Sequence, residues 1–329
     1  MKLTIEQIRA AAIGATYVVL EEDKLCFYRF NSSEISVIDN PNVQSPAGIR
    51  IRFKTDGNLL KMKIHTQALS PIRSYFSFDV LVNGVIAGCI QNLSDNDCKG
   101  DYANKSYPLG SFQEDFCLGH GEKCVELVFP HSVKASIESV EIVDATYVLP
   151  VKKNKTMLFY GDSITQGYDA LHPSKSYAAR LADAMDADVV NKALGGAVFD
   201  PRLVQIPWER KPDYVVVAYG TNDWNSVDLK CFKKNAEGFR RGIETNYSNI
   251  PVFMITPIWR SDWLSSKKCG AFFNIEKTIR DVFENRPNIT VISGTDLVPH
   301  NIDFFGDLWV HPNDSGFRHY ADNLKKYLV

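Results

Sequence analysis

The sequence lacks an excess of charge of one sign and any long apolar run. Its 37 Lys and Arg residues are matched by 39 Asp and Glu residues, so no basic surplus is available to neutralise a nucleic acid or an anionic membrane surface. No stretch approaches the length of a membrane span, and charges at Lys2, Glu6 and Arg9 interrupt what would have to be the apolar core of a signal peptide. We therefore expect neither a nucleic-acid nor a membrane partner, and a cytoplasmic location.

The sequence also lacks paired cysteines. The cysteines number seven, which is odd, and none forms a Cys-x-x-Cys pair. Disulfide frameworks and structural zinc sites both need such pairing. We expect buried free thiols and no metal site.

The length indicates two domains. A chain of 329 residues with 45% hydrophobic content exceeds the usual size of one domain and buries a full core. No internal repeat or low-complexity segment interrupts it. The change of pattern after Pro150 predicts domains at residues 1–150 and 151–329.

The first 150 residues follow a period of two. Ile49, Ile51 and Phe53 alternate with charged residues, and Leu60, Met62 and Ile64 do the same. Turn signals such as Asn83-Gly84 separate these runs. The pattern predicts half-buried antiparallel strands in a β-sandwich, with the topology of a jelly roll.

The second part alternates continuous apolar strands with helical patterns, which predicts a parallel sheet covered by helices on both faces. Strands are predicted at 156–160, 188–191, 214–219, 251–256 and 289–292. Helices are predicted near 176–185, 229–245, 271–285 and 315–328. The fold class is therefore α/β, with three layers as in flavodoxin.

A serine follows the first of these strands. The strand ending at Tyr160 leads into Gly161-Asp162-Ser163, where Gly161 permits a sharp exit and a helical segment follows. Ser163 then lies at the carboxyl edge of the sheet, where open α/β folds bind ligands and where helix N–H groups stabilise an oxyanion. The spacing is not the Gly-x-Ser-x-Gly elbow of α/β-hydrolases. Alone, Gly-Asp-Ser would equally fit a turn with a helix cap.

Three later segments fall where other strands end or before the last helix. The second strand runs through Asn191 to the glycine pair Gly195-Gly196, and the third ends before Gly220-Thr221-Asn222-Asp223. The last segment is Asp307-Leu308-Trp309-Val310-His311. Because the carboxyl ends of parallel strands share one edge, these residues are expected near Ser163.

The four segments together resemble the SGNH/GDSL hydrolase family, whose blocks supply Ser, Gly, Asn and His in this order. The resemblance covers roughly residues 156–329. It implies that Ser163 is the nucleophile and His311 its base. It also implies an oxyanion hole formed by Ser163 N–H, Gly196 N–H and the side chain of Asn222, and no cofactor. Gly196 fits the second block better than Gly195 when counted from Asn191.

The triad acid departs from the family pattern. The family most often places Asp three residues before the His, and that position here is Leu308. Asp307 lies one residue earlier, and a loop bulge could still bring its carboxylate to the outer nitrogen of the imidazole. We favour Asp307, with a Ser–His dyad held by a backbone carbonyl as the alternative and Asp303 as a distant second candidate.

Aromatic residues gather near the same edge. Trp224, Trp259 and Trp309 each lie within a few residues of a predicted strand end or of His311, and Tyr168 follows the serine loop. Aromatic faces suit sugar rings, although core packing is their commoner role. Of the histidines other than His311, only His172 is kept as a possible substrate contact. Asn313-Asp314 is interpreted as a helix cap.

A β-sandwich before such a domain is similar in architecture to two-domain carbohydrate acetyl esterases. This resemblance implies a serine esterase that removes a small acyl group, with acetyl as the expected group, from a saccharide. An acyltransferase using the same residues is one alternative. A non-catalytic carbohydrate-binding protein is the other.

Overall fold

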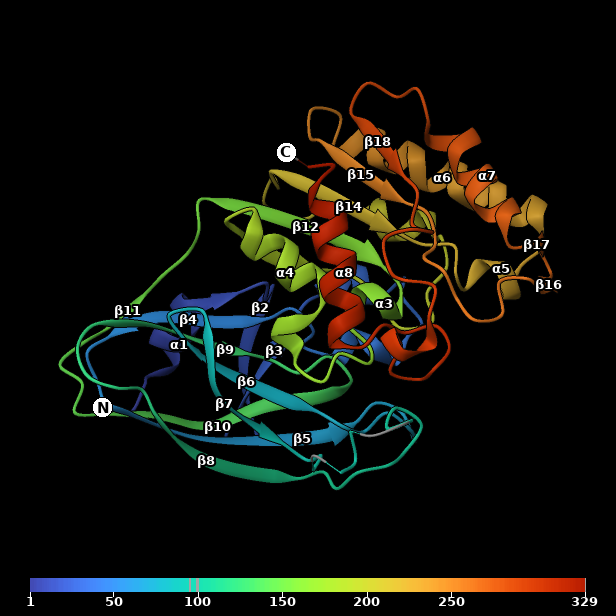
Figure 1. The fold of residues 1–329 in the computed structure, drawn as a ribbon. Helices are drawn as coiled ribbons and strands as arrows, with labels where there is room; N and C mark the ends of the chain where they lie inside the picture. The colour runs from blue at the N-terminus through green and yellow to red at the C-terminus, as the bar shows by residue number, and fades with distance from the viewer. Residues whose placement is uncertain (95, 99–100, 329) are drawn as a thin grey trace.

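The computed structural model describes residues 1–94, 96–98 and 101–328, and its N-terminal strands form two antiparallel sheets that pack face to face (Figure 1). One sheet has the order β1 (Ala12–Ile13), β4 (Arg50–Thr55), β9 (Lys123–Val128), β6 (Ser77–Val82) and β7 (Val85–Gln91), with β11 (Val148–Pro150) also beside β4. The other has the order β2 (Tyr17–Glu21), β3 (Lys24–Tyr28), β10 (Val133–Val143), β5 (Leu59–Ala68) and β8 (Ser111–Cys117).

The period of two produces this sandwich. In β5 the side chains of Leu60, Met62 and Ile64 are buried while the residues between them face outward. They pack against apolar residues of the opposite sheet, including Ile51 and Phe53, in a single core. Helices in this half are short: α1 (Ile5–Ala11), α2 (Ser32–Ile35) and the 3-10 turn η1 (Pro41–Gln44). The predicted sandwich is confirmed, and its jelly-roll topology stays a prediction.

The second half is built on a parallel sheet. Its strand order is β13 (Ala187–Asn191), β12 (Lys155–Gly161), β14 (Tyr214–Ala218), β15 (Val252–Ile255) and β18 (Ile289–Ile292). From β12 the chain moves first to one side and then to the other, so the sheet is doubly wound and has a switch point at the carboxyl end of β12. The predicted α/β class is confirmed.

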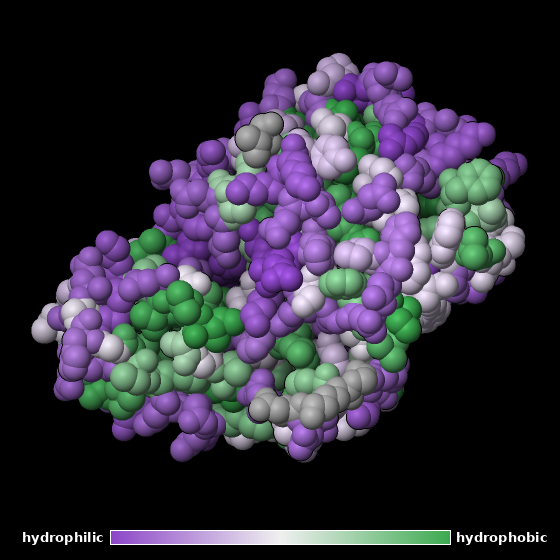
Figure 2. All heavy atoms as spheres, viewed as in Figure 1, coloured by the Kyte–Doolittle hydropathy of each residue, from purple (hydrophilic) through white to green (hydrophobic). Residues whose placement is uncertain are grey.

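Helices cover both faces of the parallel sheet. The helices are α3 (Ser163–Gln166), α4 (Tyr177–Ala184), α5 (Asp223–Ser226), α6 (Leu229–Asn246), α7 (Phe273–Phe283) and α8 (Asp314–Lys325). The short elements are η2 (Pro173–Lys175), η3 (Pro201–Val204), η4 (Ile302–Phe304) and the hairpin β16 (Ser266–Lys267) and β17 (Gly270–Ala271). Apolar residues of α6 and α7 fill one core, and those of α4 and α8 fill another. The outward faces of α4 and α8 are hydrophilic (Figure 2).

A segment that follows β3 crosses from the sandwich to the parallel-sheet half. The guanidinium of Arg29 donates hydrogen bonds to the backbone oxygens of Asn191 and Ala193, each at 2.8 Å. Phe30 packs in the core beside α6, and Glu34 forms a buried ion pair with Lys192 at 2.8 Å. The antiparallel sheets precede residue 151 and the parallel sheet follows it, whereas the segment 29–44 contacts both halves. The division into domains at residue 150 stays a prediction.

The cysteines are only partly as expected. Among the described residues no disulfide is formed, and Cys26 and Cys269 are buried. Cys117 is exposed, which corrects the expectation of burial, because on β8 its neighbour Phe116 faces the core and alternation turns Cys117 outward. The remaining four are half-buried. No helix in the described part of the chain is both long and apolar enough to cross a membrane.

Candidate active site

Ser163 is the first residue of α3, which begins two residues after the end of β12. Asp162 precedes the helix in an extended conformation and caps it, because its carboxylate accepts a hydrogen bond from the Ile164 N–H at 2.9 Å. Gly161 is required at the end of the strand, since a Cβ there would lie 2.2 Å from the Thr165 hydroxyl. The short exit from β12 therefore fixes Ser163 at the switch point of the sheet.

Ser163, His311 and Asp307 form a hydrogen-bonded chain. The Ser163 Oγ lies 2.7 Å from Nε2 of His311, and Nδ1 of the same ring lies 2.6 Å from Oδ2 of Asp307. The second carboxylate oxygen, Oδ1, accepts hydrogen bonds from the backbone N–H groups of Trp309, Val310 and His311 at 2.8–3.1 Å. This is the geometry of a Ser–His–Asp triad.

The spacing of four residues between Asp307 and His311 is accommodated at Leu308. Leu308 adopts a left-handed conformation, with φ of 56°, which is unusual for a residue other than glycine. The bulge lets Asp307 turn back under the ring although it lies one position earlier than the family pattern places it. Asp303 is exposed, and its carboxylate accepts a hydrogen bond from Asn301 instead.

The candidate oxyanion donors Gly195, Gly196 and Asn222 differ in whether their N–H groups are already engaged. The Gly195 N–H donates to Oε1 of Gln166 at 2.6 Å, so it is already engaged. Gly196 is exposed and has a φ of 76°, a conformation that glycine adopts without strain. The Asn222 amide donates one N–H to the Ala197 oxygen at 3.0 Å and has a second N–H to offer. The structure thus favours Gly196 over Gly195 as a donor.

The sandwich holds the loop that carries Gly196. The side-chain amide of Asn40 donates to the Gly195 oxygen at 2.9 Å. The neighbouring Asn42 accepts a hydrogen bond from the Tyr168 hydroxyl at 2.8 Å. The crossing segment 29–44 therefore fixes both the glycine loop and the aromatic ring beside it.

The four aromatic residues occupy different environments. The Tyr168 ring lies 5.8 Å from the His311 ring, and Trp309 is 45% exposed two residues before His311. Trp259 is nearly buried, stacks on His300, and lines a hollow of about 90 Å³ with Trp263 and Phe273. Trp224 has no exposed surface, because its Nε1–H donates to the Gly270 oxygen and its ring packs in the core. Trp224 therefore offers no face to a substrate, contrary to the sequence-based expectation.

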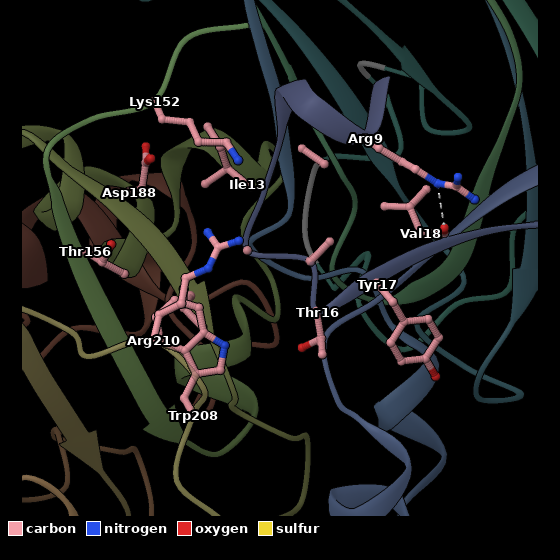
Figure 3. Close-up of a pocket in the computed structure, with 14 residues that line it drawn as sticks. Arg9, Ile13, Thr16, Tyr17, Val18, Lys152, Thr156, Asp188, Trp208 and Arg210 are labelled. Atoms are coloured by element: carbon pink, nitrogen blue, oxygen red, sulfur yellow. Dashed lines mark hydrogen bonds between the residues drawn. The ribbon is translucent and has the colours of Figure 1, made fainter. Parts of the chain in front are cut away.

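His172 and Asn313 fall outside the site. The Nδ1 of His172 lies 2.8 Å from the carboxylate of Asp79 in the sandwich, so the ring ties the two halves together. Asn313 caps α8 through its side chain, as expected. A separate hollow of about 360 Å³ lies at the other edge of the sheet, near Thr156 and Asp188 at the beginnings of β12 and β13 (Figure 3).

Burial and hydrogen bonding shift the carboxyl groups of this region in opposite directions. Burial acts to raise the pKa of Asp307, but the hydrogen bond and charge of His311 outweigh it and hold that pKa well below its usual range. Burial raises the pKa of Asp162 to about 6 and that of Asp223 to about 7. Asp307 therefore stays ionised beside the imidazole.

Two charged residues near His311 were not predicted from the sequence. Arg73, in the loop between β5 and β6, reaches from the sandwich to within 3.2 Å of Asp307 Oδ2 and of His311 Nδ1. Asp169, which follows α3, is fully buried, and its Oδ2 lies 3.7 Å from the same nitrogen. Neither lies in a recognisable motif, so no signal in the sequence pointed to them.

Comparison with known proteins identifies a family and structures of the same fold. The family model of the GDSL-like lipase/acylhydrolase family matches residues 159–319. The sequence matches no curated protein.

Solved structures share the fold over nearly the whole chain. A salicylyl-acyltransferase from a tetracycline biosynthetic pathway is 18% identical with a TM-score of 0.77, and the match covers 96% of this chain and 93% of the other. A Bacteroides ovatus structure described as a GDSL-like lipase is 16% identical with a TM-score of 0.75, covering 100% and 96%. A family two carbohydrate esterase from Clostridium thermocellum, in complex with cellohexaose, is 14% identical with a TM-score of 0.62, covering 86% and 94%. The parallel-sheet half of this chain, behind its N-terminal β-sandwich, is thus a GDSL-like lipase/acylhydrolase domain and belongs to that family.

Proposed function

We propose that the protein is a serine esterase that works through an acyl-enzyme on Ser163. His311 takes the proton of the Ser163 hydroxyl through Nε2, and the alkoxide attacks the ester carbonyl. The tetrahedral oxyanion is stabilised by the N–H groups of Ser163 and Gly196 and by the Asn222 amide. His311 then protonates the leaving alcohol, and water hydrolyses the acyl-enzyme. The observation that carries this proposal is the chain of hydrogen bonds at 2.7 Å and 2.6 Å through His311.

Asp307 supports this cycle by orientation and charge. Its hydrogen bond keeps the proton on Nδ1, so Nε2 is free to accept the proton of Ser163. Since the carboxyl group stays ionised, it also stabilises the imidazolium that forms. The three backbone N–H groups on Oδ1 hold the carboxylate in place. We therefore propose a triad with Asp307 in place of a dyad.

The proposed substrate is a small acyl ester, such as acetyl, of a saccharide. The exposed aromatic surface beside His311 supports a saccharide as the alcohol part of this ester. On the outer side, the exposed Trp309 ring is backed by the guanidinium of Arg260 at 4.9 Å. An aromatic face fixed in this way suits the apolar face of a sugar ring. The family two carbohydrate esterase of the same fold also supports this substrate class.

The test is hydrolysis of nitrophenyl acetate, butyrate and octanoate by the wild type and by Ser163→Ala. We expect the acetate to be the best substrate and the variant to lose nearly all turnover. Activity that rises toward the octanoate would reject the acetyl proposal. No nitrophenol release at any chain length, with sugar binding retained in Ser163→Ala, would instead identify a carbohydrate-binding protein.

Acyl transfer is the second candidate, because the acyltransferase described above shares the fold at a TM-score of 0.77. The same residues would form the acyl-enzyme, and an acceptor hydroxyl would replace water. Adding a xylo- or cello-oligosaccharide to the acetate assay separates the two. A hydrolase releases acetate whether or not the sugar is present, whereas a transferase forms an acetylated sugar detectable by mass spectrometry.

A further inference from the structure

Two buried carboxylates face the same nitrogen of His311. Asp307 Oδ2 lies 2.6 Å from Nδ1, and Asp169 Oδ2 lies 3.7 Å from it. In the described part of the chain the Asp169 Oδ2 has no hydrogen-bond partner. Burial raises the pKa of Asp169, while the charges of His311 and Arg73 act in the opposite direction. A single-acid triad has one such carboxylate, so the second needs a physical explanation.

Arg73 lies between the two carboxylates. Its Nε donates to Asp169 Oδ1 at 3.3 Å, and its Nη2 donates to Asp307 Oδ2 at 3.2 Å. The guanidinium lies 5.7 Å from the centre of the Tyr168 ring, and its side chain is only 15% exposed. An arginine held by two carboxylates and an aromatic face is confined to one place.

The sandwich also holds Asp169 itself. The Tyr75 hydroxyl donates to Asp169 Oδ1 at 2.9 Å and accepts from the Asp169 N–H at 2.7 Å. The Tyr102 hydroxyl donates to the Asp169 backbone oxygen. Arg73, Tyr75 and Tyr102 all come from the sandwich, so this domain builds the surroundings of His311.

We propose that Arg73 is a positioning residue for His311. Arg73 neutralises the charge of Asp169, so that the imidazole faces one net negative charge, as in a triad with a single acid. The contact between Arg73 Nη2 and His311 Nδ1 is then electrostatic and not a hydrogen bond. Nδ1 already donates its proton to Asp307 and cannot accept one from Arg73. The inference rests on the proposed function, in which a neutral His311 is the base. Too much negative charge would keep the ring protonated and inactive as a base.

Other groups near His311 lie just before and just after α3. Asp162 precedes Ser163 and interacts electrostatically with the ring, and the Tyr168 ring packs against it. Asp162 has a raised pKa because of burial and is turned toward the Ile164 N–H. Arg73 is thus the cation in contact with Asp307 and Asp169 among the described residues.

The experiment follows the protonation of His311 by ¹⁵N NMR in the intact protein, with His311→Gln used to assign the signal. Four variants are compared with the wild type: Arg73→Met, Asp169→Asn, Arg73→Met with Asp169→Asn, and Arg73→Lys. Removing Arg73 should raise the pH midpoint at which the ring gains its proton by about one unit or more, and Asp169→Asn should lower it by a similar amount. The double variant restores one net negative charge and should return the midpoint close to that of the wild type.

Activity gives an independent readout. The acid limb of kcat/KM should move in the same direction in each variant. Arg73→Lys keeps the charge but cannot reach both carboxylates, so its midpoint should stay near that of the wild type while kcat falls several-fold.

A midpoint unchanged in both single variants, or a double variant that does not return toward the wild type, would overturn the proposal. If Arg73→Met fails to fold, the Asp169→Asn shift alone decides. Because the NMR titration needs no turnover, an inactive protein would refute the esterase function without affecting this test.

Discussion

Replacing Asp307 by Asn tests the triad at the level of a single proton. The side-chain amide has one oxygen and one NH₂, and these can face either way. Three backbone N–H groups point at the Oδ1 position, so they favour the oxygen there and leave the NH₂ facing Nδ1 of His311. Nδ1 must then accept, and the ring proton moves to Nε2, where it faces Ser163.

The preference can be estimated from these contacts. A hydrogen bond contributes about 1 kcal/mol, so turning the amide over would forfeit roughly 3 kcal/mol and bring donors together. That corresponds to at least a hundredfold bias toward the unproductive tautomer. Since Nε2–H cannot accept the Ser163 proton, we expect kcat to fall on the order of a thousandfold to ten-thousandfold.

The assay is nitrophenyl acetate hydrolysis at neutral pH, together with ¹⁵N NMR of His311 to identify the tautomer. Asp303→Asn is the matched control, because the Asp303 carboxylate contacts Asn301 and not His311. This substitution should leave kcat unchanged. An Asp307→Asn variant that keeps more than about a tenth of wild-type kcat, with its proton still on Nδ1, would refute the reasoning. If that activity disappeared only on adding Asp169→Asn, then Asp169 would be the acceptor.

Four further outcomes are expected. Asn222→Ala should lower kcat about a hundredfold or more with little change in KM. A kcat equal to that of the wild type would show that the Asn222 amide does not stabilise the oxyanion. Gly196→Ala should reduce kcat and also lower Tm, because a Cβ there meets open space but a φ of 76° is strained for alanine; wild-type turnover would contradict the role of Gly196 as a donor. Burial raises the pKa of Asp223 to about 7 from 3.8, so the contribution of this carboxyl group to stability is full below about pH 4 and is lost as pH rises through 7. Asp223→Asn should therefore show a smaller fall of Tm from about pH 5 to about pH 8 than the wild type. Equal slopes of Tm against pH for the two proteins in scanning calorimetry would refute this. Lys192→Met leaves buried Glu34 without its ammonium and should cost about 3–5 kcal/mol in urea unfolding, part of which Glu34→Gln should restore; no recovery would mean that packing, not charge, sets the loss.

The fold was predictable where the sequence pattern is repetitive. Alternation over residues such as Leu60, Met62 and Ile64 indicates which face of a strand is buried, and continuous apolar runs indicate a parallel sheet. The same logic locates the site, because parallel strands end at one edge. Ser163 and Asn222 could therefore be predicted at one edge of the sheet, and they do follow the neighbouring strands β12 and β14.

Contacts between distant loops were not predictable in the same way. Arg73 contacts Asp169 across 96 positions and His311 across 238, with no periodicity to connect them. Trp224 was misplaced because its direction depends on α5, a helix of four residues that is too short to show a pattern. The bulge that serves Asp307 could be suggested from spacing, but the left-handed Leu308 is visible only in the structure.

The crossing segment 29–44 bears on how the two halves can be exchanged. Expressing residues 151–329 alone would remove the hydrogen bonds that Arg29 donates to the backbone oxygens of Asn191 and Ala193. It would also remove the ion pair of Glu34 with Lys192 and the hydrogen bond from Asn40 to the Gly195 oxygen. Buried polar groups left without partners lower the stability of the fold. The groups that would lose their partners lie close in sequence to Gly196, the proposed oxyanion donor. The sandwich therefore cannot be replaced freely, because a chimaera with a different N-terminal domain would need a segment that makes the same contacts. A chain cleaved between residues 151 and 154 should remain associated through these contacts and stay active.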